Sequence, residues 1–293
     1  MSSFQDLIGH LQTNFSLDKN VRRQRRQKWK EKTLDKQVSA AKFAVSYSVW
    51  DGEELLEASI RQIRSQVDYI NVVWQEKSWT GMPGNPNLKQ ELEDLQRQGL
   101  IDELIEYQSL CNETYQEPAK RQLGLDAAIR VGCNYFMTMD TDEFYVEEQF
   151  AQAKKFMIEG KIDHGFVLIK AYGSSPKKQW IHSEMMPNQV PFFTRIELDS
   201  NIDRDMSYPY IADPSRKIVM RKGARFMLIP GIAMHHMTYV RRNLAQKMKA
   251  SSAAHIFERS GVSGEELVRK IDLQSSAVED QFDLLPLMEQ WKE

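Results

Sequence analysis

Two aspartates, Asp140 and Asp142, stand one residue apart directly after the apolar run 135–139. Carboxylates this close repel each other. A β-strand over the apolar run would place both at its carboxyl end, where open α/β sheets bind ligands. Carboxylate oxygens suit hard divalent cations, so the pair predicts a site for Mn²⁺ or Mg²⁺. The competing interpretation is a pair of surface acids, and Glu143 remains open between supporting the site and starting a helix.

Two adjacent histidines, His235 and His236, form a second candidate. Neutral imidazole is a good ligand for Mn²⁺. The side chains of neighbouring residues on a strand point to opposite sides of the sheet. At most one of the two histidines can therefore be a metal ligand, and we favour His236. The alternative places one histidine in the core and the other in solvent. Arg241, Arg242 and Lys247 follow; they could clamp a diphosphate, or they could form the solvated face of a helix.

The elements that must position these groups alternate between strand and helix up to residue 150. Apolar, β-prone runs predict strands over 43–49, 69–74, 101–107 and 135–139. Apolar residues at helical spacing predict helices over 53–66, 88–98 and 118–131. This alternation predicts an α/β fold of Rossmann-like type, an open and mostly parallel sheet with helices on both faces.

The pattern loosens after residue 150. We expect a strand over 164–172 and an irregular, proline-containing stretch over 173–215. Short strands are expected over 217–220 and 225–228, and helices over 243–258 and 264–291. The first 37 residues read as a polar helix followed by a basic run.

Composition limits the function further. The 293 residues carry a net charge of -2, which gives no electrostatic argument for a nucleic-acid partner. The two cysteines, Cys111 and Cys133, form no C-x-x-C pair, which favours a reducing compartment. No apolar run is long enough for a transmembrane helix or signal peptide, so we expect a cytoplasmic protein. The basic stretch from Arg22 to Lys32 could hold it at the inner face of a membrane, or could be a solvated helix.

Three blocks of the chain resemble GT-A glycosyltransferases, especially those of the family 2 type. The first, FAVSYSVWDGEELLEASIRQIRSQVDYINVVWQ, is similar to their opening strand, acidic turn, helix and second strand. The second, EPAKRQLGLDAAIRVGCNYFMTMDTDEF, is similar to the helix, strand and D-x-D motif, in a D-x-D-E-F variant. The third, MHHMTYVRRNL, resembles a late histidine segment. The resemblance covers 43–143 well and the C-terminal half loosely.

The resemblance implies a metal-dependent glycosyltransferase that moves a sugar from a UDP- or GDP-type donor to a glycan, lipid-linked or other acceptor, as in polysaccharide synthesis. It implies nucleotide-sugar contacts from Ser46, Val49, Trp50, Asp51, Gln75, Lys120, Arg121, Asp140 and Thr141. It implies the metal ligands Asp140, Asp142 and His236. Family 2 enzymes carry an aspartate after the second strand that contacts the nucleobase. This chain has Gln75 and Glu76 there, so the identity of the nucleobase in the donor stays open.

The expected division of the chain follows from the same resemblance. Residues 1–37 would be a basic helical extension, 38–240 a GT-A catalytic domain, and 241–293 a C-terminal helical segment. Within the domain, 42–150 would bind the nucleotide and 151–240 the acceptor. An inverting transfer needs a general base, for which Glu184 and Asp213 are candidates, although each could be a plain surface acid. If the protein has no such general base, a retaining mechanism becomes the alternative.

Two other functions remain in competition. A nucleotidyltransferase acting on sugar phosphates also uses paired carboxylates and a metal, but it should carry a glycine-rich phosphate loop, and the turn 49–52 has one glycine. A non-catalytic nucleotide-sugar binding protein on the same scaffold is the third reading. The intact D-x-D argues against it.

Overall fold

The computed structural model describes residues 41–78, 81–108, 116–180, 189–241, 244, 246–247 and 263–277. The strands are β1 (Phe43–Val49), β2 (Tyr69–Trp74), β3 (Glu103–Glu106), β4 (Tyr135–Asp140), β5 (Glu143–Phe144), β6 (His164–Ala171), β7 (Lys178–Trp180), β8 (Gln189–Arg195), β9 (Phe226–His236) and β10 (Ser275–Ala277). The helices are α3 (Glu53–Ile63), α4 (Leu88–Arg97), α5 (Glu117–Arg130), α6 (Glu147–Glu159) and α9 (Gly264–Leu273), with 3₁₀ turns η1 (Arg64–Gln66) and η2 (Pro214–Arg216).

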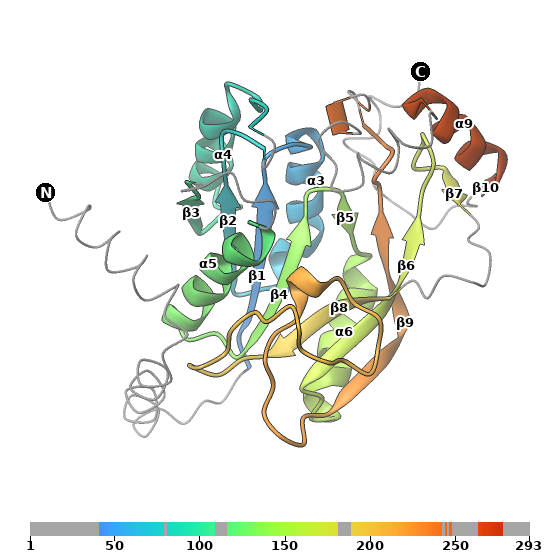
Figure 1. Ribbon diagram of the computed structural model, residues 1–293. Coiled ribbons are helices and arrows are strands. Elements are labelled where there is room, and N and C mark those ends of the chain that lie inside the picture. The colour runs from blue at the N-terminus through green and yellow to red at the C-terminus, as the bar shows by residue number, and fades with distance from the viewer. Residues whose placement is uncertain are drawn as a thin grey trace, which may run out of the picture.

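One eight-stranded sheet organises the molecule, in the order β3-β2-β1-β4-β8-β6-β9-β5 (Figure 1). The first four strands are mutually parallel. β8 runs antiparallel to both β4 and β6, β6 is parallel to β9, and β5 is antiparallel to β9. Within the described chain, therefore, only β5 and β8 oppose the common direction of this sheet. The predicted α/β class, with an open and mostly parallel sheet, is confirmed.

Helices cover both faces of the sheet, as predicted. On one face Leu56 and Ile60 of α3 join Val45 and Tyr47 of β1 in the larger apolar cluster. On the other face Leu125 and other apolar residues of α5 pack on the opposite side of β1 and β4. Figure 1 shows α5 in front of the sheet and α3 and α6 behind it. Because both faces are covered, the residues of the central strands β1 and β2 are almost all buried, instead of alternating between buried and exposed.

The largest error of the sequence prediction is β8. This strand lies in the stretch expected to be irregular, yet it fills the sheet between β4 and β6. Pro191 obscured it, because a proline cannot donate to a strand ladder. The structure accommodates Pro191 opposite Phe166, beside a register shift in β6, while Phe192 and Phe193 are both buried. α6 was also not predicted.

Of three smaller expectations, two were wrong, and the strand expected over 225–228 was too short. Residues 217–220 form no strand and contribute only a bridge between Ile202 and Ile218. The strand expected over 225–228 is the beginning of the longer β9, which continues past Pro230 and Gly231 through a register shift against β6. The last helix ends at Leu273, after which the chain forms β10 and pairs with β7.

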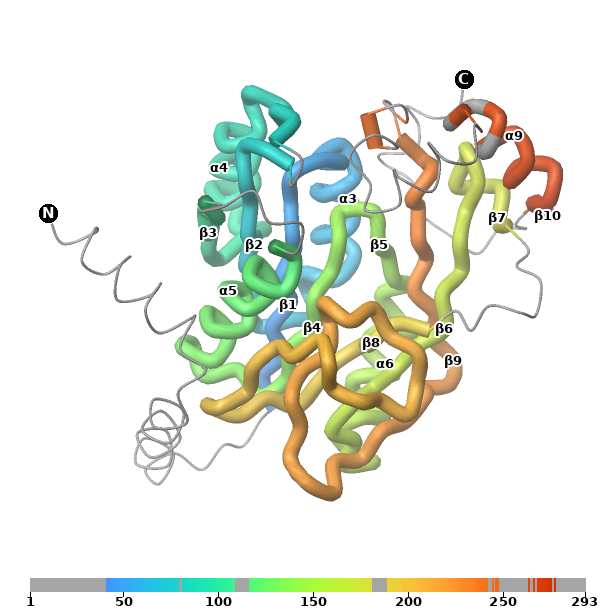
Figure 2. Tube along the Cα trace, viewed as in Figure 1, coloured from blue at the N-terminus to red at the C-terminus, as the bar shows by residue number. Residues whose placement is uncertain are grey.

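The long connection between β8 and β9, residues 196–225, contains only η2 among regular elements and lies on the α5 side of the sheet (Figure 2). The extension 1–37, with Arg22 to Lys32, lies outside the described residues, as do 278–293 and most of 243–258. In the part of the chain that is described, no helix has the length and apolar character needed to cross a bilayer.

Candidate functional site

The acidic cluster stands at the carboxyl end of β4. Asp140 is the last residue of β4, and Glu143 begins the two-residue strand β5. β5 pairs with β9, so that Glu143 lies opposite His236 and Phe144 opposite His235. This short antiparallel pairing brings the late histidines to the D-x-D acids, a contact that the sequence resemblance implied without giving its cause.

Two arginines neutralise Asp140. Arg121 Nη2 of α5 donates to Oδ1 at 3.0 Å, and Arg216 Nη2 of η2 donates to Oδ2 at 2.8 Å. Burial alone would raise the pKa of Asp140, but Arg121 and Arg216 outweigh it and hold that pKa below its usual range. Both carboxylate oxygens are thus engaged by cations of the protein, and a role for Asp140 as a metal ligand stays a prediction.

Arg216 also binds Glu143, and sequence reasoning missed it. Its Nη1 donates to Glu143 Oε2 at 3.0 Å, and its Nη2 contacts Glu143 Oε1. The side chain of Arg216 is 6% exposed and that of Glu143 is 2% exposed. Burial raises the pKa of Glu143 despite the neighbouring guanidinium. No local motif marks Arg216, because it sits in a connection without regular pattern and reaches β4 only through the fold.

Asp142 faces a different set of partners. Its Oδ2 accepts from Arg241 Nη2 at 2.6 Å and from Lys247 Nζ at 3.3 Å. Its Oδ1 is buried, has no hydrogen-bond partner among the described residues, and lies 3.6 Å from His236 Nε2. Burial would raise the pKa of Asp142, but Lys247, Arg241 and His236 lower it well below its usual value. The carboxylate is therefore charged and has one oxygen without a partner.

The two histidines point to opposite sides of β9. His235 is buried and shares a 2.6 Å hydrogen bond with the hydroxyl of Tyr172, and burial lowers its pKa to about 3. His236 turns toward Asp142, and its Nε2 also lies 2.6 Å from Thr238 Oγ1. Of the pair, only His236 reaches the acidic cluster.

A divalent ion fits this arrangement if the ligand supplies part of its shell. Within the described residues no group of three or more acidic, histidine or cysteine side chains could hold an ion. Asp142 Oδ1 and His236 Nε2 offer two donors of the right type, and the unpartnered state of Oδ1 leaves it available. Mg²⁺ typically takes one or two carboxylates and completes its shell with phosphate oxygens and water.

A second group of polar side chains lies between the sheet and α5. Buried atoms without a hydrogen-bond partner in the described chain are Ser46 Oγ, Ser48 Oγ, Asn71 Oδ1, Gln75 Oε1, and Arg121 Nε and Nη1. Ser46 and Asn71 are register partners on β1 and β2, and α5 approaches them at Gly124. A Cβ at Gly124 would lie 1.9 Å from Ser46 Oγ. Buried polar atoms normally have partners. Because α5 packs directly against Ser46 and Asn71, a polar ligand could supply the missing partner only at the carboxyl end of the row, at Ser48 and Gln75.

The remaining predicted nucleotide-sugar contacts divide by location. Lys120 is buried on α5 and pairs with Glu117 at 3.0 Å. Thr141 Oγ1 donates to the backbone carbonyl of Asp51 at 3.2 Å, which ties the turn after β1 to the D-x-D. Trp50 Nε1 is buried beside Gly84 and has no hydrogen-bond partner among the residues that the structure describes. Val49, in contrast, belongs to the apolar core on the α3 side.

The two candidate bases have different outcomes. Glu184 lies outside the described residues. Asp213 caps η2 by accepting from the backbone N–H and the hydroxyl of Ser215, each at 2.8 Å. Burial would raise the pKa of Asp213, but Arg121 and Arg216 outweigh it and lower that pKa. A carboxylate with a lowered pKa is a weak general base, and the role of Asp213 stays a prediction.

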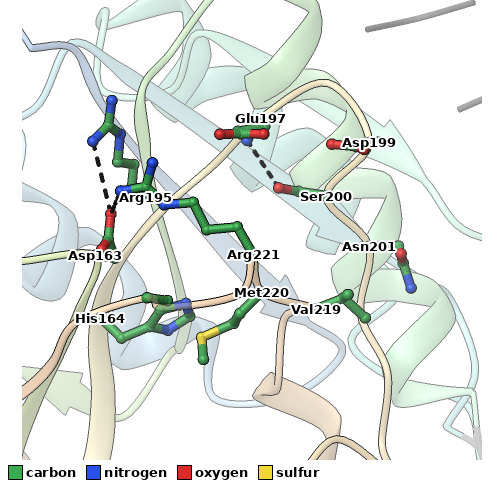
Figure 3. A pocket seen from close by; sticks show the side chains of 11 residues that line it. Asp163, His164, Arg195, Glu197, Asp199, Ser200, Asn201, Val219, Met220 and Arg221 are labelled. Atoms are coloured by element: carbon green, nitrogen blue, oxygen red, sulfur yellow. Dashed lines mark hydrogen bonds and ion pairs between the residues drawn. The ribbon is translucent and has the colours of Figure 1, made fainter. Parts of the chain in front are cut away.

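A cavity of about 180 Å³ at the opposite, amino-terminal end of β6 lacks these signs (Figure 3). Asp163 in its wall accepts from Arg221 Nη2 at 2.7 Å and from the backbone N–H of Arg225 at 2.9 Å. Arg195 lies 3.7 Å from the same carboxylate. No residue in this wall has a buried polar side-chain atom without a partner in the described chain. The side chains of this cavity satisfy one another, which sets it apart from the cluster at β4.

No family model matches this chain, and no curated protein matches it. Among solved structures it is similar to S. aureus TarS 1–349 in complex with UDP, with 13% identity, a TM-score of 0.35, and 53% of this chain and 46% of that chain covered. It is also similar to GalNAc-T7 with UDP, GalNAc and Mn²⁺, with 10% identity, a TM-score of 0.40, and 86% and 56% covered. The chain spans about half the length of these structures. Structural similarities this distant are not used to argue the function of this protein.

Proposed function

We propose that this protein is a metal-dependent glycosyltransferase of the GT-A type, which transfers a sugar from a nucleoside diphosphate donor to an acceptor hydroxyl with inversion. The support comes from the sequence resemblance over 43–143 and from the site at the carboxyl end of β4. The observation that carries the proposal is the unpartnered Asp142 Oδ1, buried 3.6 Å from His236 Nε2 and flanked by Arg241 and Lys247.

The carboxyl end of the polar row, at Ser48 on β1 and Gln75 after β2, is suited to the nucleoside. Gln75 ends this row, where its buried Oε1 has no hydrogen-bond partner in the described chain and is available to an N–H group of the nucleobase. An amide presents both a donor and an acceptor, whereas a carboxylate only accepts. Ser48 and Asp140 are register partners at the carboxyl ends of β1 and β4. In this proposal they lie close to the ribose, which joins the nucleobase to the diphosphate.

The cationic side chains are suited to the diphosphate. Arg241 and Lys247 both contact Asp142 Oδ2, so they stand beside the predicted ion and would bind phosphate oxygens there. Arg121 and Arg216 keep Asp140 and Glu143 neutralised, which limits repulsion of the incoming donor. A divalent ion held by Asp142 and His236 would offset the negative charge of the departing nucleoside diphosphate.

A thermal-shift panel tests the proposal. UDP and GDP should stabilise the protein when Mn²⁺ is present and much less without it, and Asp142→Asn should abolish the metal-dependent part. Stabilisation by a nucleoside triphosphate alone would favour a nucleotidyltransferase. No response to any nucleotide would refute the proposal. Release of sugar from a panel of nucleotide sugars then identifies the donor.

A further inference from the structure

The carboxylate of Asp142, the predicted metal ligand, is already bound by two cations of the protein. Its Oδ2 accepts from Arg241 Nη2 at 2.6 Å and from Lys247 Nζ at 3.3 Å. These two positive charges offset the single negative charge of Asp142, and they repel any further cation that approaches the same carboxylate. A divalent ion can therefore bind tightly at the free Oδ1 only if one of the two protein cations leaves.

The two cations differ in their freedom to leave. The side chain of Arg241 is 2% exposed and packs on the turn after β1, where a Cβ at Gly52 would lie 1.4 Å from its Nη1. The side chain of Lys247 is 29% exposed, and its contact with Asp142 is the longer of the two. An ammonium group on a flexible four-carbon stem changes partners by rotation of side-chain bonds. Lys247 is therefore the exchangeable cation, whereas Arg241 is fixed.

The charge of Lys247 acts on three carboxylates at this end of the sheet. Burial would raise the pKa of Asp142, and Lys247 is the foremost of the charges that lower it instead. Burial would also raise the pKa of Asp140, and Lys247 supports the two arginines that lower it. At Asp51, burial raises the pKa, while Arg241 and Lys247 oppose the rise. A compact positive charge among several carboxylates has the electrostatic role that a bound metal ion would have there.

We propose that Lys247 is an exchangeable counter-ion, which holds the cation position beside Asp142 in the ligand-free protein and passes to a phosphate oxygen of the donor when a divalent ion takes that position. The inference rests on the proposed function and deepens it, because it makes the binding of metal and nucleotide interdependent. Without nucleotide, Lys247 stays on Asp142 and weakens metal binding. A bound diphosphate offers Lys247 a stronger anionic partner and so relieves the repulsion.

Lys247→Gln tests the exchange in a Mn²⁺ titration followed by the electron paramagnetic resonance signal of the free ion, with and without saturating UDP. Without UDP the variant should bind Mn²⁺ at least about tenfold more tightly than the native protein, because a divalent and a univalent cation a few ångströms apart repel by about that factor even in water. A titration of UDP without protein corrects for the Mn²⁺ that free nucleotide binds.

With UDP present the gain in Mn²⁺ affinity should largely disappear, because Lys247 of the native protein has then left Asp142. The factor by which UDP tightens Mn²⁺ binding should therefore be about tenfold smaller in Lys247→Gln than in the native protein, and linkage requires the same change in the effect of Mn²⁺ on UDP. A lysine that stays in place would instead give equal gains with and without UDP.

Lys155→Gln is the matched control. Lys155 on α6 is 76% exposed and lies 3.7 Å from Glu159, so its variant should keep both native affinities. Lys247→Arg keeps the positive charge and should keep most of the native coupling between Mn²⁺ and UDP. Removing Lys247 leaves Arg241 as the counter-ion of Asp142, so Lys247→Gln should fold, which urea unfolding checks.

Three results would overturn the inference: equal gains in Mn²⁺ affinity with and without UDP, no gain for Mn²⁺ alone, or the same change in Lys247→Arg as in Lys247→Gln. The native protein separates this inference from the proposed function. If UDP tightens Mn²⁺ binding by the same factor in the native protein and in Lys247→Gln, the transferase proposal stands and the exchange is refuted. If UDP leaves Mn²⁺ binding by the native protein unchanged, both proposals are refuted.

Discussion

Replacing Arg216 by methionine should change stability and ligand binding together, in directions that follow from its charge. The substitution keeps a side chain of similar length but removes the guanidinium shared by Asp140 and Glu143. Glu143 is then a buried carboxylate without a counter-ion, because Arg216 is the only cationic side chain within 4 Å of it in the described part of the chain. Arg121 still neutralises Asp140, so the loss concentrates on Glu143.

Breaking a buried ion pair by removing one partner costs about 3–5 kcal/mol. The pKa of Glu143 is already raised by burial, so this carboxyl takes up a proton readily once Arg216 is gone. Protonation limits the penalty, and we expect the lower end, about 3 kcal/mol of unfolding free energy. Arg221→Met is the control from the same connection. Arg221 is half exposed and pairs with Asp163, so its loss should cost about 1 kcal/mol or less.

Urea unfolding measures the stability, and two titrations measure the charge effect. The titrations are made at a pH high enough to keep Glu143 ionised in the variant, where the cluster without Arg216 is one charge more negative, so Mn²⁺ alone should bind more tightly and UDP should bind more weakly. A purely structural role for Arg216 would weaken both. Changes of the same sign in the two titrations, or a stability equal to that of Arg221→Met, would refute the reasoning. Arg216→Lys should fall between, because an ammonium group cannot span both carboxylates as a forked guanidinium does.

Three further changes follow from the structure. Gly124→Ala should destabilise the protein by about 1–3 kcal/mol in urea unfolding, because its Cβ would overlap Ser46 Oγ; an unchanged midpoint would show that α5 does not approach β1 as described. His235 has a folded pKa of about 3, below its unfolded value near 6.5, so it contributes stability above pH 6.5 that is lost as the pH falls. From pH 6.5 to pH 5 the loss from His235 should be about 2 kcal/mol, and His235→Asn should make the pH dependence of unfolding shallower by that amount, leaving the part that comes from His164, whose pKa burial also lowers to about 3; an equally steep dependence in the variant would contradict this. Gln75→Leu should weaken UDP binding about tenfold by calorimetry with little effect on stability, whereas unaltered affinity would remove Gln75 from the nucleoside site.

The parallel half of the fold could be predicted because its local signals agree. The apolar run that became β1, the amphipathic α3 and the apolar β2 each follow a clear period, and short connections restrict their arrangement. The second half could not be read in this way. β8 is interrupted by Pro191, and β9 continues through Pro230 and Gly231, so each strand looks broken in sequence. β8 and β9 form because they pair with strands that lie far from them in the sequence.

The site divides along the same line. Asp140 and Asp142 could be predicted as candidate site residues because they follow a recognisable strand. His236 could be predicted because it belongs to the segment MHHMTYVRRNL. Arg216 could not be found, because only the return of the 196–225 connection to α5 and β4 brings it to the acids. Arg121, the other partner of Asp140, was expected beside the nucleotide, but its ion pair with Asp140 was not predicted. Ion pairs between residues far apart in the sequence produce no periodic pattern. The D-x-D acids were therefore predicted as free metal ligands, whereas in the structure Asp140 is already paired with two arginines.

The metal is the centre of this account, and a titration of Mn²⁺ followed by the electron paramagnetic resonance signal of the free ion tests it directly. Native protein should bind Mn²⁺ more tightly when UDP or GDP is present, because the nucleotide completes the shell begun by Asp142 and His236. Asp142→Asn should lose this binding, while Asp94→Asn, an exposed acid on α4, should keep it. Equal Mn²⁺ binding by Asp142→Asn and the native protein in the presence of nucleotide would contradict the central claim.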